Sequence, residues 1–98
     1  MKVFISQPMS GLSNEEIIKA REEATKELKD KFNCEIEVID NLQLDIDNHG
    51  NKLFYISNDI RWLGEADMVY LLRNWNTHRG CRVEHYIAKE YGIDILCQ

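Results

Sequence analysis

The chain contains 98 residues, 44% of them hydrophobic and 9% aromatic, and its formal net charge at pH 7 is −5. This composition excludes a disordered chain and predicts a single domain over residues 1–98, near the small end of domains that build their own core. The acidic balance disfavours a nucleic-acid partner, which requires a basic face, but it is compatible with a small ligand.

The first half of the chain predicts a strand, a turn and a long helix. Lys2–Ser6 has the apolar character of a short buried strand, and residues 7–11 form a turn. Ser13 and Glu16 have the spacing of a capping box, so we expect a helix to begin there and to run to about Phe32. Its apolar face consists of residues at helical spacing: Ile17, Ala20, Ala24 and Leu28.

A second strand is expected at Glu35–Ile39, followed by a polar loop over Asp40–Lys52 that contains the sequence Asn48-His49-Gly50-Asn51. Apolar residues then recur at helical spacing at Leu53, Ile56, Ile60 and Leu63. Tyr55, Asp59 and Trp62 occupy a neighbouring stripe of that helix. The remaining expected elements are a strand at Asp67–Leu72, a loop at Arg73–Arg79, a helix at Gly80–Tyr91 and a strand at Asp94–Cys97.

Strands that alternate with helices predict an α/β fold: a small flavodoxin-like (Rossmann-like) three-layer domain with a parallel sheet. In such a sheet the loops that follow the strands meet at one edge, where α/β proteins build their sites. We therefore expect the loop after the first strand, the Asp40–Lys52 loop and the Arg73–Arg79 loop to lie together.

The chain shows no feature of export or membrane insertion. Met1 and Lys2 lead directly into the strand-like Val3–Ile5, so no signal region is expected. No apolar run approaches the roughly 20 residues of a membrane helix, so no membrane partner is expected. The three cysteines lack close paired spacing, which favours a reduced, cytoplasmic compartment.

Glu84 is the first candidate catalytic residue, four positions after Gly80 at the start of a predicted helix. The positive end of the helix dipole favours its ionised form, and an ionised carboxylate beside a cleft can attack a sugar carbon. The alternative is a first-turn residue on a solvated face. Asp59 is the second candidate, since paired carboxylates can divide the roles of nucleophile and acid. Its alternative is a surface aspartate paired with an arginine.

Two of the loops contain candidate substrate-binding residues. The first loop ends at a helix N-terminus, where backbone N–H groups can bind a phosphate or another oxyanion. Trp75 could stack on a base, although a tryptophan that closes a hydrophobic gap is the commoner case. The full set is Ser6, Gln7, Pro8, Met9, Ser10, Gly11, Tyr55, Trp75, Asn76, His78, Arg79 and Gly80.

His78, Cys81 and His85 are spaced like neighbouring zinc ligands, and Cys81 and His85 share a helix face. No second cluster of ligand residues supports such a site, and the surrounding sequence is explained without it. We therefore expect no metal and no cofactor.

Several of these residues form an ordered set of motifs. The chain opens with Val3–Gly11, a strand and a small-residue loop. An aspartate on a helix, Asp59, precedes a strand that begins with a second aspartate, Asp67. A glutamate, Glu84, lies four residues after a glycine, Gly80. It is followed by a small residue, Ala88, and by a further glycine, Gly92. In order and spacing they resemble the nucleoside 2-deoxyribosyltransferase family.

A closer likeness exists to short, uncharacterised relatives that are common in phage and prophage genomes, through Phe4–Gly11 and Arg79–His85. At His78 the transferases have an aspartate and their nucleotide-hydrolysing relatives a serine. The resemblance implies cleavage or transfer of the N-glycosidic bond of a (deoxy)nucleoside or its monophosphate. Glu84 would attack C1′ and Asp59 would orient the glutamate or the sugar, while Tyr55 and Trp75 would bracket the base.

The alternative function is binding without turnover: sequestration of a nucleotide or an ADP-ribose-like signal, as in phage counter-defence, in the host cytoplasm. In either case the partner is a small nucleoside or nucleotide. We also expect a homo-oligomer, because a domain of this size buries a modest fraction of its surface. Tyr55 and Trp62 are expected on an exposed face that needs cover.

Overall fold

A computed structural model describes residues 1–98 except 46, 48–49 and 52. Part of the predicted Asp40–Lys52 loop, namely Ile46, Asn48, His49 and Lys52, therefore lies outside the described residues. The elements follow the predicted order. They are β1 (Lys2–Ser6), α1 (Asn14–Lys31), β2 (Glu37–Val38), α2 (Phe54–Leu63), β3 (Met68–Leu71), the 3₁₀ turn η1 (Trp75–Thr77), α3 (Arg79–Glu90) and β4 (Asp94–Cys97).

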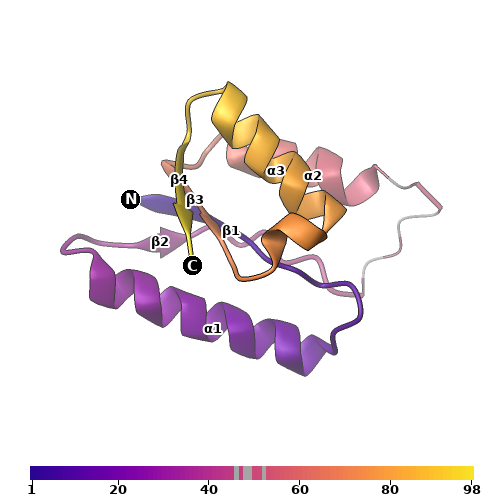
Figure 1. Cartoon of the computed structure of the whole chain (residues 1–98), viewed down its shortest axis with the longest axis horizontal. Coiled ribbons are helices and arrows are strands. Elements are labelled where there is room, and N and C mark those ends of the chain that lie inside the picture. Colours follow the sequence, from indigo (N-terminus) through magenta and orange to yellow (C-terminus); the bar gives the residue numbers. More distant parts are fainter. Residues whose placement is uncertain (46, 48–49, 52) are drawn as a thin grey trace.

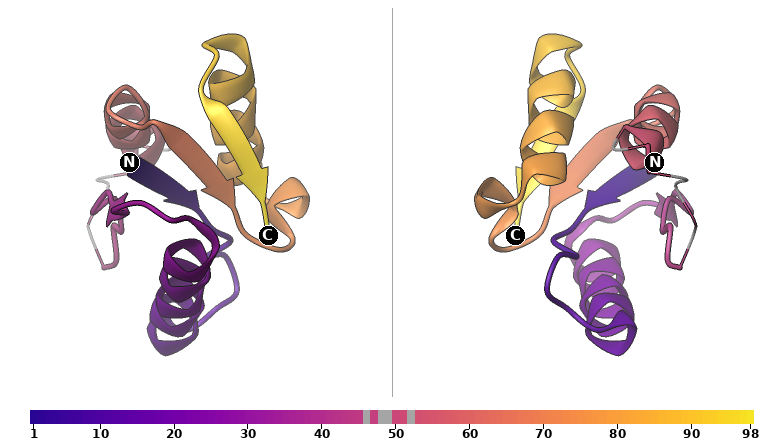
Figure 2. Two further views of the ribbon diagram at one scale, coloured as in Figure 1. Left: turned by 90° about the vertical axis from the view of Figure 1, so that its left-hand side faces the viewer. Right: turned by 90° about the vertical axis from the view of Figure 1, so that its right-hand side faces the viewer.

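The four strands form one parallel sheet in the order β2-β1-β3-β4. α1 covers one face of this sheet, and α2 and α3 cover the other, as Figures 1 and 2 show. The predicted small flavodoxin-like three-layer α/β domain is thereby confirmed. β2 pairs over only two residues, so most of the predicted Glu35–Ile39 strand is irregular backbone.

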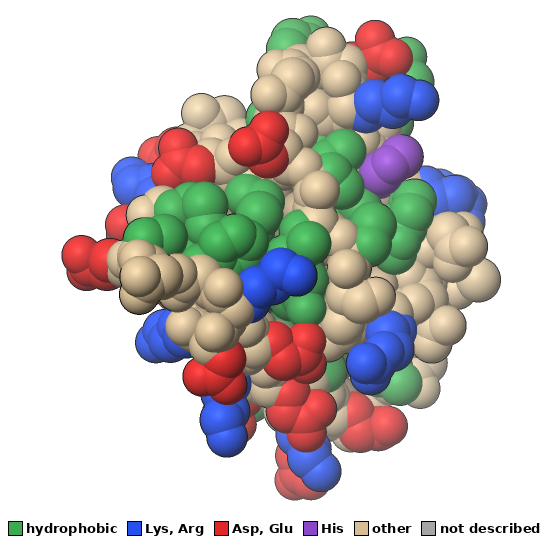
Figure 3. All heavy atoms as spheres, turned by 60° about the vertical axis from the view of Figure 1, so that its left-hand side comes forward, with side chains coloured by type: hydrophobic (Ala, Val, Ile, Leu, Met, Phe, Trp, Pro, Cys, Tyr) green, Lys and Arg blue, Asp and Glu red, His purple; other side chains and the backbone are tan. Residues whose placement is uncertain are grey.

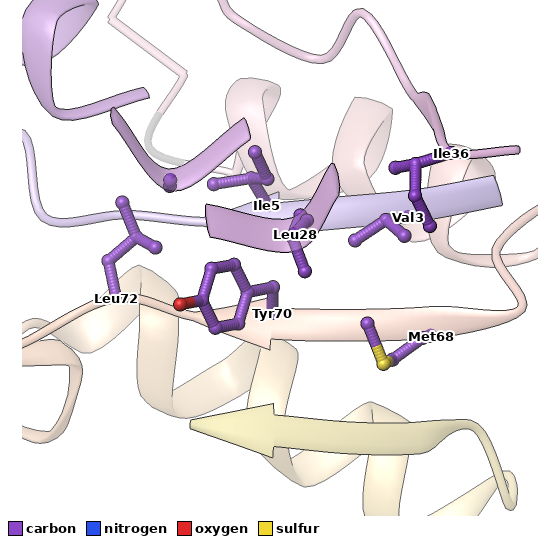
Figure 4. Packing of buried hydrophobic residues seen from close by; sticks show 8 residues of the cluster. Val3, Ile5, Leu28, Ile36, Met68, Tyr70 and Leu72 are labelled. Atoms are coloured by element: carbon purple, nitrogen blue, oxygen red, sulfur yellow. The ribbon is translucent and has the colours of Figure 1, made fainter. Parts of the chain in front are cut away.

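Alternate residues of the central strands enter two different cores. Val3, Ile5 and Tyr70 face α1 and pack with Leu28 in one cluster, part of which Figure 4 shows. Phe4, Val69 and Leu71 belong to the cluster on the face that α2 and α3 cover. Because side-chain direction alternates along a strand, Ser6 at the end of β1 points the same way as Phe4, toward α2 and α3.

The start of α1 is fixed as the sequence predicts. The backbone N–H of Ser13 donates to Glu16 Oε1 at 3.1 Å, and the backbone N–H of Glu16 donates to Ser13 Oγ at 3.2 Å. This reciprocal pair is the expected capping box. Ile17, Ala24 and Leu28 of the predicted apolar face are buried.

One prediction about α2 is wrong. Trp62 is half-buried and packs against the core cluster beneath α2 and α3, and Tyr55 is half-buried at the border of a cleft. Neither ring lies on an open face, because a helix packed between the sheet and a neighbouring helix buries more than one stripe. Within the described part of the chain, no helix is both long and apolar enough to span a membrane.

Candidate functional site

Ser6 and Glu84 meet at the end of β1 that lies at the carboxyl edge of the sheet. Ser6 Oγ donates a hydrogen bond of 2.6 Å to Glu84 Oε1, although 78 positions separate the two residues in sequence. Both side chains are buried: Ser6 is 1% exposed and Glu84 is 7% exposed. This contact is short for a hydroxyl–carboxyl hydrogen bond, so the position of Glu84 is fixed from the sheet.

Glu84 lies at the sixth residue of α3 rather than in its first turn, because the helix begins at Arg79. It points inward, and burial is the main cause that raises the pKa of Glu84 well above its usual range. The expectation that the helix dipole holds this carboxylate ionised is therefore wrong: desolvation outweighs a dipole that acts mainly over the first turn. The solvated-face alternative for Glu84 is wrong as well.

Asp59 of α2 is hydrogen-bonded to Glu84, and we call these two residues the acid pair. Burial also raises the pKa of Asp59, whereas the hydrogen bond from Glu84 lowers it. Both pKa values are raised, which favours a state in which the two carboxyl groups share one proton. Asp59 does not pair with Arg61, which instead donates to Asn58 Oδ1 at 3.1 Å.

Two amide side chains orient the outer member of the acid pair. Gln43 Nε2 donates to Asp59 Oδ1 at 3.3 Å and to the Tyr55 carbonyl at 3.2 Å. Asn58 Nδ2 in turn donates to Gln43 Oε1 at 2.7 Å. The chain of contacts fixes Gln43 as a donor toward Asp59, which favours the ionised state of that carboxylate.

The acid pair opens into a cleft of about 360 Å³, which lies within the range of small-molecule sites. Its walls come from the loops after β1 and β2, the first half of α1, and α2. The lining residues are Ile5, Gln7, Met9, Ser10, Leu12, Asn14, Ile17, Arg21, Asn41, Leu42, Gln43, Leu44, Asp45, Tyr55, Asp59 and Glu84. The lining thus combines apolar and amide side chains with the acid pair, one further carboxylate, Asp45, and one cation, Arg21.

Arg21 is a cation in the lining of this cleft, and sequence reasoning did not single it out. Its guanidinium donates to Gln7 Oε1 at 3.2 Å, to the Ile39 carbonyl at 2.7 Å and to Asn41 Oδ1 at 2.6 Å. Asn41 also donates to the Ile5 carbonyl at 3.1 Å. The result is a network that joins α1 to the ends of β1 and β2.

The loop after β1 divides between two clefts. Met9 borders the acid-pair cleft and Pro8 borders a second cleft of about 310 Å³, while Gln7 and Ser10 border both. Gly11 borders neither; it has a φ of +82° and continues the turn into α1.

At the N-terminus of α1, where the sequence predicts an oxyanion site, the backbone N–H groups of Ser13 and Glu16 are used by the capping box. Glu16 accepts from the Ser13 backbone, and Asn14 Nδ2 donates to Asp45 Oδ2 at 2.8 Å. Three carboxylates, those of Glu15, Glu16 and Asp45, therefore lie around this helix end.

The predicted residues of the third loop lie apart from the acid-pair cleft. Trp75 packs against the core and stacks on His85, with ring centroids 4.5 Å apart. His78 borders the second cleft, where its Nδ1 is 3.1 Å from Thr77 Oγ1. Asn76 and Arg79 are exposed and border neither cleft. Trp75 therefore closes an apolar gap, and the structure does not bring it opposite Tyr55.

Gly80 lies in the first turn of α3, facing α2. A Cβ added there would lie 3.9 Å from Ile56 Cδ1, which is an ordinary contact. Gly80 is therefore not needed to leave room for a ligand beside Glu84.

The zinc-like spacing does not produce a ligand cluster. Cys81 is buried beside Ser6, whereas His85 stacks on Trp75 and His78 faces Thr77. Among the described residues there is no group of three His, Cys, Asp or Glu side chains that could hold a metal ion.

Sequence reasoning located the two carboxylates and the first loop but missed Arg21, Asn41 and Gln43. Arg21 directly follows Ala20 of the apolar stripe, at the border between the buried and solvated faces of α1. Asn41 and Gln43 lie in the loop that follows β2, at the carboxyl edge, where α/β proteins place residues that meet a ligand. The positions of these residues were visible in the sequence, but the directions of their side chains were not.

The chain matches a described protein family over residues 1–97, that is, over nearly its whole length. The family is described as a domain of unknown function, DUF4406. No curated protein matches the sequence, and no solved structure matches it. The chain therefore belongs to the DUF4406 family.

Proposed function

We propose that this protein cleaves or transfers the N-glycosidic bond of a (deoxy)nucleoside or nucleoside monophosphate, with Glu84 as the nucleophile. The observation that carries the proposal is the acid pair, half-buried Asp59 with buried Glu84, in the lining of a cleft of about 360 Å³. Structural carboxylates are rarely buried together, because each one loses its hydration. The resemblance to nucleoside 2-deoxyribosyltransferases supplies the reaction class.

The shared proton suggests how the pair would divide the work. Glu84 must lose its proton before it can attack, and Asp59, the hydrogen-bonded acceptor, can take it. Glu84 then bonds to C1′ while the electron pair of the glycosidic bond moves to the base nitrogen, and Asp59 returns the proton to that nitrogen. The products are a glycosyl ester on Glu84, a free base and an ionised Asp59. Water or a second base would release the sugar.

The arrangement favours a covalent intermediate over direct displacement by water. Inverting glycosidases hold their two carboxyl groups roughly 6.5–9.5 Å apart to leave room for the attacking water. Asp59 and Glu84 are joined by a hydrogen bond, so the pair lacks the wide spacing of an inverting site. This favours attack by a carboxylate.

The walls of the cleft suit a nucleoside. The half-buried ring of Tyr55 and the side chains of Met9 and Leu12 offer apolar surface to a base. The acid pair and the amide of Gln43 offer hydrogen-bonding groups to a sugar. We therefore propose that Tyr55 contacts the base and that Trp75 does not.

Binding without turnover is the second candidate function. It is favoured by the proton on Glu84, since a protonated carboxyl is a poor nucleophile. Its ligand class is the same, a nucleotide or an ADP-ribose-like molecule. The sequestration proposal expects tight binding that survives the loss of Glu84 with only a modest decrease in affinity.

One experiment separates the two functions. The protein is incubated with a panel of deoxynucleosides, ribonucleosides and their 5′-monophosphates, and free base is measured by chromatography while binding is measured by calorimetry. Free base that requires Glu84 supports the enzyme. Tight binding of a panel member with no free base supports sequestration. No binding and no turnover across the panel contradicts both.

We also propose that the chain forms a homo-oligomer in the cytoplasm. β4 is an edge strand of the sheet, and apolar side chains gather over the middle of the face that Figure 3 shows, on the side of the molecule where β4 lies. Such a face is a favourable contact between copies. Sedimentation at micromolar concentration tests this, and a monomer throughout would contradict it. Three unpaired cysteines suit a reducing compartment.

A further inference from the structure

Arg21 has contacts that differ from those of the other cations of α1. Lys19, Lys26, Lys29 and Lys31 are exposed. Arg21 instead turns toward the sheet edge and makes three hydrogen bonds of 2.6–3.2 Å with groups on two other segments. Ordering a long side chain and removing it partly from water are unfavourable unless such contacts offset them.

The three contacts join the segments that form the acid-pair cleft. Gln7 follows β1, and Ile39 and Asn41 follow β2. A guanidinium is planar and presents its donors in a fixed fork, so one group can hold several acceptors in a fixed relation. Gln7 is held from its other end too, because its Nε2 donates to the Ile17 carbonyl at 2.9 Å. Two loops and one helix are thus fixed through one side chain.

The same guanidinium acts on the acid pair by its charge. Arg21 is one cause that lowers the pKa of Asp59, against the burial that raises it. Asp59 in turn helps to keep Arg21 charged, together with Asp40, against the desolvation that lowers the pKa of Arg21. The charge and the hydrogen bonds therefore come from the same side chain but act on different groups.

We propose that Arg21 is the positioning residue of this cleft: its three hydrogen bonds fix the loops after β1 and β2 as one wall, and they hold its positive charge in the cleft that Asp59 also lines. The consequence for catalysis rests on the proposed function. The contacts and the charge effect do not, because they exist without turnover.

Other titratable and charged groups near the acid pair also contribute to the electrostatic potential that a test would measure. They come from every neighbouring segment: Asp40 and Asp45 after β2, Cys81 and Arg82 on α3, and Arg21 on α1. Arg82 reaches the backbone carbonyl of Asn76 at 3.3 Å, away from Asp59. Arg21 is therefore the cation whose removal should change the acid pair most.

The test follows the side-chain carboxyl signals of Asp59 and Glu84 by ¹³C NMR as pH is changed from 3 to 9. A coupled pair titrates in two macroscopic steps. Arg21→Gln is expected to raise the lower step by about one pH unit, the small end of the effect of a nearby opposite charge. Lys19→Gln removes the same charge from the solvated face of the same helix and should leave both steps in place.

Arg21→Lys provides a second arm, because it keeps the positive charge but lacks the planar fork that joins Gln7, Ile39 and Asn41. Because the charge is kept, the lower step should stay close to its wild-type position in this variant. If Arg21→Gln leaves the lower step unchanged, or Lys19→Gln moves it equally, the proposal is overturned. If Arg21→Gln does not fold, a lower step that rises by a full pH unit in Arg21→Lys overturns it. Neither result depends on whether any nucleoside is turned over.

Discussion

Two parts of this domain lie at the carboxyl edge of the sheet and yet do different things. The acid pair lines a cleft and is connected by hydrogen bonds to β1 and to the loop after β2. The Trp75–Gly80 segment follows β3, but its tryptophan packs on the core, and Asn76, Thr77 and Arg79 are exposed. Position at the carboxyl edge is thus not sufficient for a role in the site; the direction of the side chain decides.

The largest expected effect is on the acid pair. Glu84→Gln keeps the shape of the side chain and removes the carboxylate, so turnover should fall by at least about two orders of magnitude through loss of the covalent route. Asp59→Asn should reduce turnover less, because an amide can still orient Glu84. The rate of release of free base from the best substrate measures both. Full turnover by Glu84→Gln would remove Glu84 from the mechanism.

Thiol chemistry compares a buried position next to the acid pair with an exposed one. Burial raises the pKa of Cys81 to about 11, so its thiolate is scarce at pH 7. Cys34 is exposed. Alkylation followed by mass spectrometry should label Cys34 at least about tenfold faster than Cys81. Equal rates would mean that the region around Ser6 and Glu84 opens readily to solvent.

Ligand binding should separate the two aromatic residues. Tyr55→Ala removes apolar surface from the cleft and should weaken binding by about tenfold, equivalent to roughly 1.4 kcal/mol. Trp75→Ala should change affinity by less than about twofold at a temperature where the variant is folded, because the ring stacks on His85 outside the cleft. Calorimetry with one nucleoside tests both. A loss of binding in Trp75→Ala alone would reverse the assignment.

A separate expected effect, which needs no ligand, is on stability as a function of pH. The pKa of Glu84 is raised in the folded protein from its ordinary value of 4.5, so between these two values the folded state binds more protons than the unfolded state. Stability contributed by this group therefore falls as pH rises above about 4.5, by at most about 1.4 kcal/mol per pH unit. Urea unfolding at pH 5 to 8 should show this slope in the wild type and a flatter one in Glu84→Gln. If the free energy of unfolding changed with pH equally in the wild type and in Glu84→Gln, the bound proton would not be on Glu84.

The fold followed from local patterns that sequence states directly. The capping box at Ser13 and Glu16, the apolar stripe of α1 and the alternation of strands and helices were sufficient for the three-layer arrangement. The protonation of Glu84 was not predictable in this way. It depends on which face of α3 is buried and on a neighbour, Asp59, that another helix supplies.

The direction in which a side chain points could not be predicted either. Trp75 lies shortly after the end of β3, and Arg21 lies beside the apolar stripe of α1. Both of these features can be recognised in the sequence. Whether such a side chain turns toward the cleft or away from it depends on packing between segments that are distant in sequence. Composition and spacing carry no information about that choice.

The most direct test of the central claim is to trap the sugar on the protein. A 2-deoxy-2-fluoro nucleoside slows release of a glycosyl ester, so the wild-type protein should gain the mass of one fluorosugar, located on the peptide that contains Glu84. Glu84→Gln should gain nothing under the same conditions, while Trp75→Ala should still be labelled. A wild type that turns over the parent nucleoside yet never acquires this mass, or acquires it elsewhere, would contradict the assignment of Glu84 as the nucleophile.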